Sequence, residues 1–257
     1  MATVEFTREE LMAVAAAAEI RDSEVAIIGT GLPMIASYLA KRTHAPSASL
    51  FFESGIIDAF PRDLATGVGD FRLMSNCVKA SGLYYALSLL QGGRVDLGFL
   101  GAAEVDQYGN INSTVIGNYI KPQVRLPGSG GANDIASLAK RVVIIVPHQL
   151  RKFPERVQYI TTPGHLDGVG ARERAGLRGA GPVRVVTNLA VMGFDDETKR
   201  MKLRSLHPGV SLDQVRENTG FELLVTEPIE ETPAPTPEQL KLLREEIDPD
   251  GIYISKK

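Results

Sequence analysis

The chain has 257 residues, of which 44% are hydrophobic and 23% charged, and its formal net charge is −3 at pH 7. This length can bury a full core in one large domain or two small ones, and the composition is that of an ordinary globular protein. The slight acidity argues against bulk nucleic-acid binding, which needs a basic face. No apolar run approaches the ~18 residues of a membrane span.

The first 155 residues alternate helix and strand signals. Thr7 and Glu10 form a capping box that starts an Ala-rich helix, expected to reach about Arg21. Further helices are expected at 33–41 and 83–90. The expected strands are short apolar runs, at 24–28, 47–52, 95–100 and 141–146. Buried strands that alternate with helices predict an α/β fold with an open, mostly parallel sheet and helices on both faces.

After about residue 155 the pattern changes. Residues 163–181 form a Gly-rich, charged loop that is too long for a simple connection. A strand meander is expected over 183–206 and a helix at 211–217, which Ser211 and Gln214 cap. An acidic, Pro-rich connector at 227–237 leads to a last helix that ends near residue 247. We therefore expect one domain over 1–257, with an α/β core over about 1–155 and an extension of the same domain over about 156–257.

Glu53 is the most informative residue. It ends the apolar run Ser49–Phe52 and precedes Ser54-Gly55, so it should lie at the carboxyl end of a buried strand. Ligands bind at this edge of open α/β sheets. A carboxylate there can act as a nucleophile, a general acid or a base. The alternative is a strand-end Glu that is solvated or ion-paired.

Two glycine-rich segments are further candidates. Gly29-Thr30-Gly31 resembles half of a dinucleotide fingerprint, but Met34 stands where the third glycine is required. The segment is therefore either a packing turn or the backbone wall of an acyl or pantetheine pocket.

Gly128-Ser129-Gly130-Gly131 precedes an apolar helix that Asn133 or Asp134 can cap. Backbone N–H groups at a helix start could form an oxyanion hole. The alternative is a surface turn that only caps the helix.

The remaining polar candidates have simpler interpretations. Asn110 and Asn112 follow a buried strand and either bind a ligand or, more commonly, brace a neighbouring loop. The single cysteine, Cys77, is either a nucleophile or a buried inert thiol, and its lack of a disulfide partner fits the reducing cytoplasm. The four histidines are dispersed, so no metal site is expected.

Together these segments resemble the β subunit of class I coenzyme A transferases, most of all the glutaconate CoA-transferase β subunit. The similarity covers nearly the whole chain in family order. The matching elements are Gly29-Thr30-Gly31-Leu32-Pro33, Glu53-Ser54-Gly55, Val68-Gly69-Asp70, Gly101-Ala102, Val105-Asp106, Tyr108-Gly109-Asn110, Asn112-Ser113-Thr114, Gly128–Asn133, Pro163-Gly164, Asp167-Gly168, Arg172-Glu173-Arg174, Gly176-Leu177 and Glu245–Pro249.

The resemblance implies roles for these residues. The family's nucleophile is the Glu of the Glu-x-Gly element, which is Glu53 here, and the family's Gly-Gly-Ala loop beside the thioester carbonyl matches Gly131 and Ala132. The expected contacts to the coenzyme A thioester, a substrate and not a tightly bound cofactor, come from the two glycine-rich segments. They are Gly29, Thr30, Gly31, Gly130 and Asn133.

The resemblance also implies the partners. The substrates are an acyl-CoA and a free carboxylic acid, and an α subunit on a separate polypeptide supplies the rest of the pocket. The 163–181 loop is the expected place for part of the subunit contact. Two segments depart from the glutaconate enzyme: His165 replaces an aromatic residue, and residues 60–67 differ. Both are candidates to line the acid pocket, so the acid itself stays open.

Two alternatives remain. Relatives on this fold are decarboxylases or hydrolases of CoA thioesters that replace the nucleophilic Glu, so Glu53 favours a transferase. A non-catalytic ligand-sensing or scaffolding subunit is the other alternative.

Overall fold

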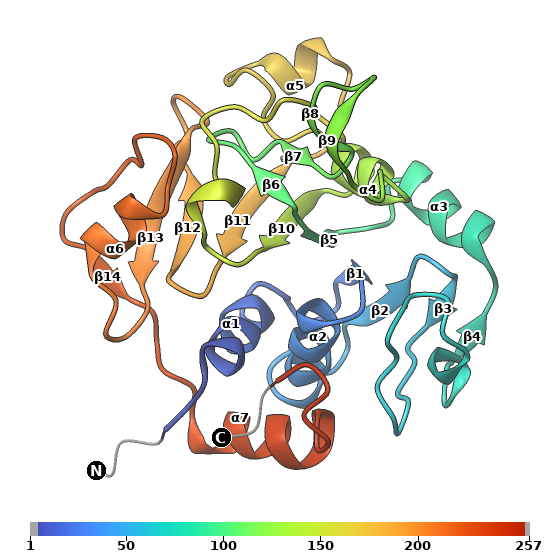
Figure 1. The fold of residues 1–257 in the computed structure, drawn as a ribbon. Coiled ribbons are helices and arrows are strands. Elements are labelled where there is room, and N and C mark those ends of the chain that lie inside the picture. Colours follow the sequence, from blue (N-terminus) through green and yellow to red (C-terminus); the bar gives the residue numbers. More distant parts are fainter. Residues whose placement is uncertain (1–4, 255–257) are drawn as a thin grey trace. The chain divides into compact units, whose positions relative to one another are not determined.

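The computed structural model in Figure 1 describes residues 5–254. The chain forms two compact units, residues 1–99 with 233–257, and residues 100–232. These boundaries differ from the division expected near residue 155. The C-terminal segment belongs to the first unit because it packs against helices near the N-terminus, a long-range contact that composition does not reveal.

The sheet of the first unit has the strand order β5-β1-β2-β3-β4. Its strands are β1 (Val25–Ile28), β2 (Ser49–Phe52), β3 (Ile56–Ile57), β4 (Lys79–Ala80) and β5 (Leu97–Gly101), whose end opens the second unit. β1 runs parallel to both β5 and β2, while β3 and β4 are antiparallel additions. Ile28 pairs with Phe52, so β1 and β2 end side by side.

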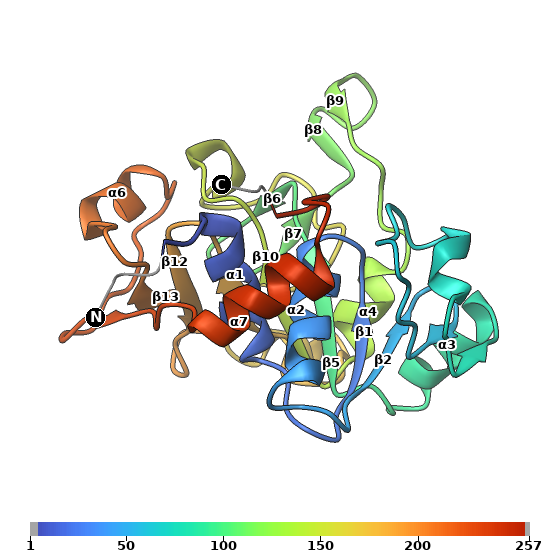
Figure 2. The same ribbon diagram turned by 90° about the horizontal axis from the view of Figure 1, so that it is seen from below.

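Helices α1, α2 and α7 of this unit gather together, as Figures 1 and 2 show. The helices are α1 (Arg8–Ala17), α2 (Leu32–Arg42), η1 (Phe71–Met74), α3 (Leu83–Gln91) and α7 (Pro237–Lys241), which continues as the π-helix η3 (Leu242–Ile247). The predicted capping box of Thr7 and Glu10 is confirmed, although α1 ends at Ala17, before Arg21.

The second unit has the strand order β14-β13-β12-β11-β10. Its strands are β10 (Arg141–Ile145), β11 (Pro182–Val186), β12 (Ala190–Phe194), β13 (Met201–Leu206) and β14 (Glu230–Glu231), and its helices are α4 (Ala132–Leu138), η2 (Leu150–Lys152), α5 (Ala171–Arg174) and α6 (Leu212–Glu217). β10 and β11 are parallel, and β11, β12 and β13 form the predicted antiparallel meander.

The α/β class is confirmed, with parallel pairs at β5-β1-β2 and β10-β11. Two hairpins were not predicted, because their strands are too short to show an alternating pattern. They are β6 (Glu104–Val105) with β7 (Ile111–Asn112), and β8 (Val115–Gly117) with β9 (Pro122–Arg125). The cap at Ser211 is confirmed.

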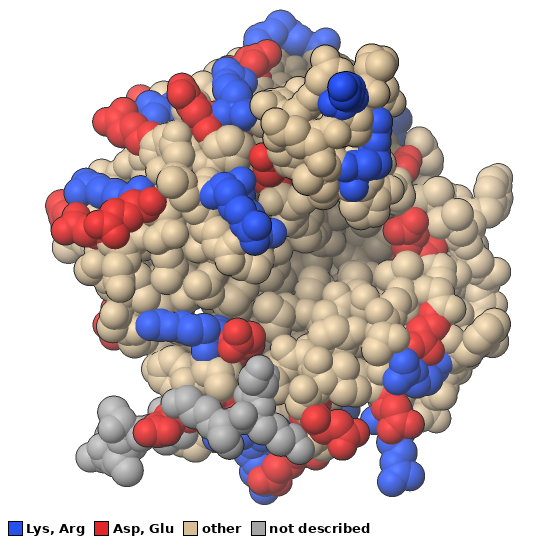
Figure 3. Space-filling model, viewed as in Figure 1, with Lys and Arg blue, Asp and Glu red and all other residues tan. Residues whose placement is uncertain are grey.

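The surface and interior are those of a folded globular chain. The largest fully buried side chains are apolar and include Phe51, Phe52, Leu39 and Phe153. On the face shown in Figure 3, basic and acidic side chains are interspersed. Within residues 5–254, no helix is both long enough and apolar enough to cross a membrane.

Candidate functional site

Glu53 lies at the tip of the β2–β3 hairpin. The buried side chains of Phe51 and Phe52 anchor β2. The Gly55 N–H donates to the Phe52 carbonyl at 2.8 Å and closes a turn whose two central residues are Glu53 and Ser54. Glu53 is half-buried. The structure therefore places this carboxylate where the sequence predicts it, at the carboxyl end of a buried strand.

The turn that carries Glu53 is held by a close backbone approach. Gly55 has a φ of +83°, and a Cβ there would lie 2.2 to 2.5 Å from the backbone of Gly82. The Ser81 N–H also donates to the Gly55 carbonyl at 3.0 Å. Only glycine fits at residue 55, and the junction before α3 thereby fixes the position of Glu53.

The Gly29–Gly31 segment lies at the end of the neighbouring strand β1. Gly31 has a φ of +84° and its carbonyl accepts the N–H groups of Met34 and Ile35, which starts α2. Pro33 lies in the first helical turn, as predicted. Because β1 and β2 end side by side, this segment and Glu53 occupy the same edge of the sheet.

Sequence reasoning missed Tyr253, which lies against this edge. Its ring is about 4 Å from the place of a Cβ at Gly31, and its hydroxyl donates to the Ala65 carbonyl at 2.7 Å and contacts Thr30. The buried carboxylate of Asp248 accepts the N–H of Tyr253 at 2.8 Å. The signal in the sequence was the Glu245–Pro249 match, which contains Asp248.

Asp70, from the Val68-Gly69-Asp70 match, starts η1. Its carboxylate accepts the backbone N–H groups of Arg72 and Thr66 and pairs with the Arg72 guanidinium at 2.5 Å. The Arg72 side chain and these N–H groups hold the pKa of Asp70 well below its usual range. Asp70 is thus an ionised carboxylate whose charge a neighbouring cation already compensates.

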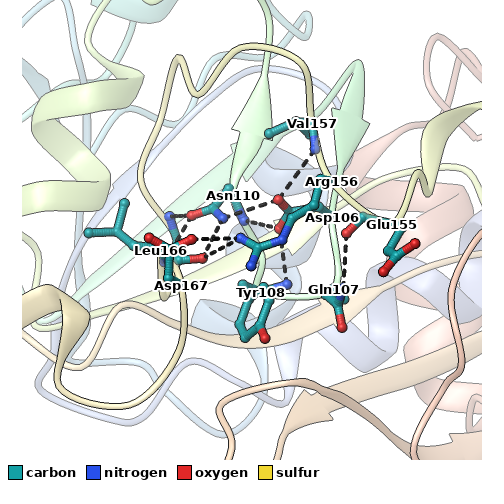
Figure 4. A network of polar contacts seen from close by, with 10 residues as sticks. Asp106, Gln107, Tyr108, Asn110, Glu155, Arg156, Val157, Leu166 and Asp167 are labelled. Atoms are coloured by element: carbon teal, nitrogen blue, oxygen red, sulfur yellow. Dashed lines mark hydrogen bonds and ion pairs between the residues drawn. The ribbon is translucent and has the colours of Figure 1, made fainter.

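The second unit contains a buried polar network around Asp106 and Asn110 (Figure 4). Asp106 accepts the backbone N–H groups of Tyr108 and Asn110 and the Asn110 side-chain amide, at 2.9 to 3.1 Å. Burial raises the pKa of Asp106, and these hydrogen bonds oppose that effect. Asn110 and Asn112 are fully buried and bond to protein groups, so bracing is their role in this unit.

Asn110 joins two motifs that are far apart in the sequence. Its side-chain oxygen accepts the N–H groups of Gly164 and Leu166 at 2.9 and 3.0 Å. A Cβ at Gly164 would lie 2.2 Å from the carbonyl carbon of Gly109. The Pro163-Gly164 segment therefore packs directly on the Tyr108–Asn110 turn, and the long loop is fixed where it begins.

The Gly128–Asn133 loop is anchored to Ser113. The Gly128 N–H donates to the Ser113 carbonyl at 2.7 Å, and the Ser113 hydroxyl donates to the Gly128 carbonyl at 2.9 Å. Gly128 and Gly130 have positive φ angles, of +92° and +50°. Glycine at both positions is what allows the chain to turn into α4.

The cap of α4 differs from the prediction. Asn133 and Asp134 lie inside the first turn, and the Ser129 hydroxyl accepts the Asn133 N–H at 3.1 Å. The cap was misassigned because Gly131 directly precedes the helix, so the nearest side-chain oxygen before it is that of Ser129. The Asn133 side chain instead donates to the Thr161 carbonyl at 3.0 Å.

The amides expected to bind an oxyanion belong to the same loop. The Ala132 N–H donates to the Ser129 carbonyl at 3.0 Å, so it could bind a second acceptor only by sharing that hydrogen. Gly131 is buried, whereas Gly130 and Asn133 are exposed. The candidate residues thus form two groups, Glu53 with Gly29–Gly31 in the first unit and Gly130–Asn133 in the second.

Arg172, from the Arg172-Glu173-Arg174 match, is a clamp to which the sequence analysis assigned no role. Its side chain is 5% exposed, and its guanidinium donates to four carbonyls. These belong to Pro163, Gly164, Ala136 and Arg178. Burial lowers the pKa of Arg172. Because Ala136 lies in α4, this one side chain ties the 163–181 loop to the helix that follows the glycine-rich segment.

His165 is an interior residue of the second unit. Its Nε2 bonds to the Pro182 carbonyl at 2.9 Å, and its ring meets Phe194 edge-on at 4.8 Å. Burial lowers the pKa of His165 to about 4, so the ring is neutral at pH 7. Cys77 is a half-buried free thiol, not a fully buried one. Among the described residues, no group of three or more His, Cys, Asp or Glu could hold a metal ion.

Known proteins resemble this chain along its full length. It is 42% identical to one subunit of the glutaconate CoA-transferase of Acidaminococcus fermentans, over 97% of this chain and 95% of that protein. It is 44% identical to one subunit of the 3-oxoadipate CoA-transferase of Pseudomonas knackmussii, over 93% and 92%.

Solved structures give the same result. The structure of glutaconate coenzyme A-transferase from Acidaminococcus fermentans matches with a TM-score of 0.93 over 98% of this chain and 99% of that chain, at 40% identity. The decarboxylase AibA/AibB matches with a TM-score of 0.83 at 27% identity, over 98% and 100%. A family model described as Coenzyme A transferase matches residues 9–218. The chain therefore belongs to the coenzyme A transferase family.

Proposed function

We propose that this chain is the β subunit of a two-subunit CoA-transferase, which moves CoA between an acyl-CoA and a free carboxylic acid, with a dicarboxylic acid as the expected acceptor. The observation that carries the proposal is Glu53, a half-buried carboxylate on a rigid turn at the sheet edge where ligands bind. The relatives with 42% and 44% identity are both subunits of CoA-transferases named for dicarboxylic acids.

The chemistry proceeds in two balanced steps. The Glu53 carboxylate attacks the thioester carbonyl carbon, the C–S bond breaks, and CoA leaves as a thiolate with an acyl-Glu53 anhydride in place. The thiolate then attacks the Glu53 carbonyl carbon, a C–O bond breaks, and the free acid departs from a Glu53–CoA thioester. The incoming carboxylate reverses both steps. No water is consumed, so the pocket must exclude it.

The glycine-rich segments serve the thioester in this proposal. Gly29, Thr30 and Gly31 line the edge beside Glu53 and contact the CoA thioester, as do Gly130 and Asn133. The Gly131 and Ala132 amides stabilise the oxyanion of the attacked carbonyl. CoA is a substrate here, no tightly bound cofactor or metal takes part, and the lone Cys77 suits a cytoplasmic enzyme.

The α subunit partner follows from the relatives, each of which is named as one subunit of its enzyme, and from apolar surface in both units. In the first unit the exposed large apolar side chains are Val68, Phe71, Met74, Val78, Leu83, Tyr84 and Ile252, and in the second they are Tyr119, Ile120, Val124, Leu150, Tyr159, Ile160 and Val169. Only Val169 belongs to the 163–181 loop, so we assign the larger share of the contact to segment 71–84 and the β8–β9 hairpin.

A decarboxylase or hydrolase of a glutaconyl-CoA-like thioester is the alternative on this fold. The decarboxylase AibA/AibB resembles the chain less closely than the transferase subunits do, at 27% identity. A reaction that only breaks a carbon–carbon bond would form no Glu53–CoA thioester. Trapping this thioester therefore distinguishes the two functions by experiment.

The test is to trap the Glu53 thioester in the complex with the α subunit. Acyl-CoA followed by borohydride should reduce the Glu53 carbonyl, and mass spectrometry of the peptide around Glu53 should detect the change. Glu53→Gln should abolish exchange between acyl-CoA and free acid while the complex still assembles on size-exclusion chromatography. Exchange at the normal rate in Glu53→Gln would overturn the proposal.

A further inference from the structure

A small cavity opens directly beside the turn that carries Glu53. Its volume is about 130 Å³. Its walls are mostly apolar and come from the first unit alone: Ser54, Ile56, Val68, Gly69, Asp70, Phe71 and Met74. Ser54 is the chain neighbour of Glu53 and shares the centre of its turn. The cavity therefore begins within one residue of the candidate nucleophile.

The Ser54 hydroxyl is the unusual polar group of this cavity. Its oxygen is buried and has no hydrogen-bond partner among residues 5–254. A buried hydroxyl without a partner destabilises the fold and therefore requires an explanation, and a ligand that accepts its hydrogen bond is one. Rotation about one side-chain bond reorients this hydroxyl, so it can serve a ligand that enters the cavity.

The other polar group of the cavity decides which ligand oxygen fits. Asp70 contributes a carboxylate that is already paired with Arg72 and accepts the N–H of Thr66. The remaining walls are largely hydrocarbon. A second carboxylate would lose its hydration and face Asp70, and the lining residues named above include no Lys or Arg to compensate it. A neutral acceptor, such as a keto oxygen, needs only the hydroxyl donor of Ser54.

We propose that this cavity is the subsite for the acyl chain of the acid, and that Ser54 donates a hydrogen bond to a neutral keto oxygen on that chain. The inference rests on the proposed transferase function and adds the group that selects the acid. A volume of about 130 Å³ holds roughly four non-hydrogen atoms, at about 30 Å³ for each water-sized group. That suits a short chain segment next to the reacting carboxyl group.

Ser54→Ala tests the hydrogen bond. The complex with the α subunit is assayed for CoA transfer to 3-oxoadipate and to adipate, which differ only in the keto oxygen. We expect the wild type to prefer the keto acid, and Ser54→Ala to reduce the ratio of the two kcat/KM values by about tenfold to a hundredfold. Ser88→Ala is the control, because the Ser88 hydroxyl bonds to the Tyr85 carbonyl at an exposed site.

Gly69→Val tests the cavity itself. Among the described residues, an added Cβ at Gly69 or at Gly67 meets no neighbour within 4 Å, and neither glycine has a positive φ, so both positions accept a side chain. Of these two glycines, Gly69 lines the cavity and Gly67 does not. Gly69→Val should raise KM for six-carbon acids more than for acetate, while Gly67→Val should leave the KM values for all these acids unchanged.

The outcomes separate this inference from the proposed function. If the wild type transfers CoA but Ser54→Ala keeps the keto preference, or Gly69→Val and Gly67→Val behave alike, the subsite assignment is wrong and the transferase function stands. If the wild type transfers CoA to no acid and no Glu53 thioester is trapped, both the subsite assignment and the transferase function are wrong.

Discussion

At the scale of single residues, the position of Glu53 depends on backbone contacts more than on its own side chain. The glycine two residues later touches the backbone of Gly82, and the intervening Ser54 completes the turn. Such a turn has no freedom to drift, which suits a nucleophile that must meet a carbonyl carbon within about 3 to 3.5 Å.

Gly55→Ala should therefore impair catalysis strongly. The new Cβ would collide with Gly82 at 2.2 Å, and the backbone must shift and carry Glu53 with it. A displacement near 1 Å costs about a hundredfold in rate, so we expect a loss of at least that size in the exchange assay. Gly93→Ala is the matched control, because it is also at a positive φ but meets no described atom within 4 Å. Equal activities of the two variants would contradict this account.

At the scale of elements, an ion pair joins the C-terminal helix to α1. Arg244 donates to the Glu10 carboxylate at 2.5 and 2.9 Å, and Glu10 is only 1% exposed. The same carboxylate accepts the Thr7 N–H within the capping box. One buried group thus links helix capping, a local feature, to a contact between the two ends of the chain.

Arg244→Ala should lower the free energy of unfolding by about 2 kcal/mol, because Glu10 loses charged hydrogen-bond donors in a buried place. Glu246→Ala is the control on the same C-terminal helix: its pair with Arg42 is 3.5 Å long and more exposed, and its loss should lower the free energy of unfolding by less than about 1 kcal/mol. Urea unfolding measures both, and equal losses would refute the distinction.

Arg172 is the corresponding element-scale contact of the second unit. Arg172→Lys keeps the charge, but one ammonium group cannot replace the planar guanidinium that serves four carbonyls. We expect a loss of at least about 2 kcal/mol and faster amide hydrogen exchange in α4. Arg174→Lys, at an exposed residue of the same short helix, should change neither quantity. If amide hydrogen exchange in α4 were unchanged in Arg172→Lys, the Arg172 clamp would not stabilise that helix.

At the scale of the whole molecule, the buried histidines His148 and His165 should make stability depend on pH. Burial lowers the pKa of His148 and of His165 from 6.5 to about 4. Below pH 6.5 the unfolded chain binds protons that the folded chain does not, so stability falls as the pH drops towards 4. At pH 5 the loss is about 2 kcal/mol for each histidine.

The variant His165→Phe should remove about half of this acid sensitivity, because Phe has no proton to gain. The measurement is the free energy of unfolding at pH 7 and at pH 5 for both proteins. The difference between the two pH values should shrink by about 2 kcal/mol in His165→Phe. An undiminished difference would mean that His165 does not titrate as described.

The sequence alone determined the features that depend on near neighbours. The caps at Thr7 and Ser211 could be predicted because each bonds to a residue three positions away. Glu53 at a strand end was readable because apolar runs mark buried strands. The family itself followed from short motifs in order, and its model matches residues 9–218.

Only the tertiary structure decided the contacts between distant segments. The clash that requires Gly55, the packing of Tyr253 on Gly31 and the Arg172 clamp each join residues that are far apart in the sequence. The packing of the C-terminal segment in the first unit also joins residues that are far apart in the sequence. Hydrophobic periodicity and capping are local signals, whereas a close backbone approach or a shared carbonyl depends on how the chain packs in three dimensions.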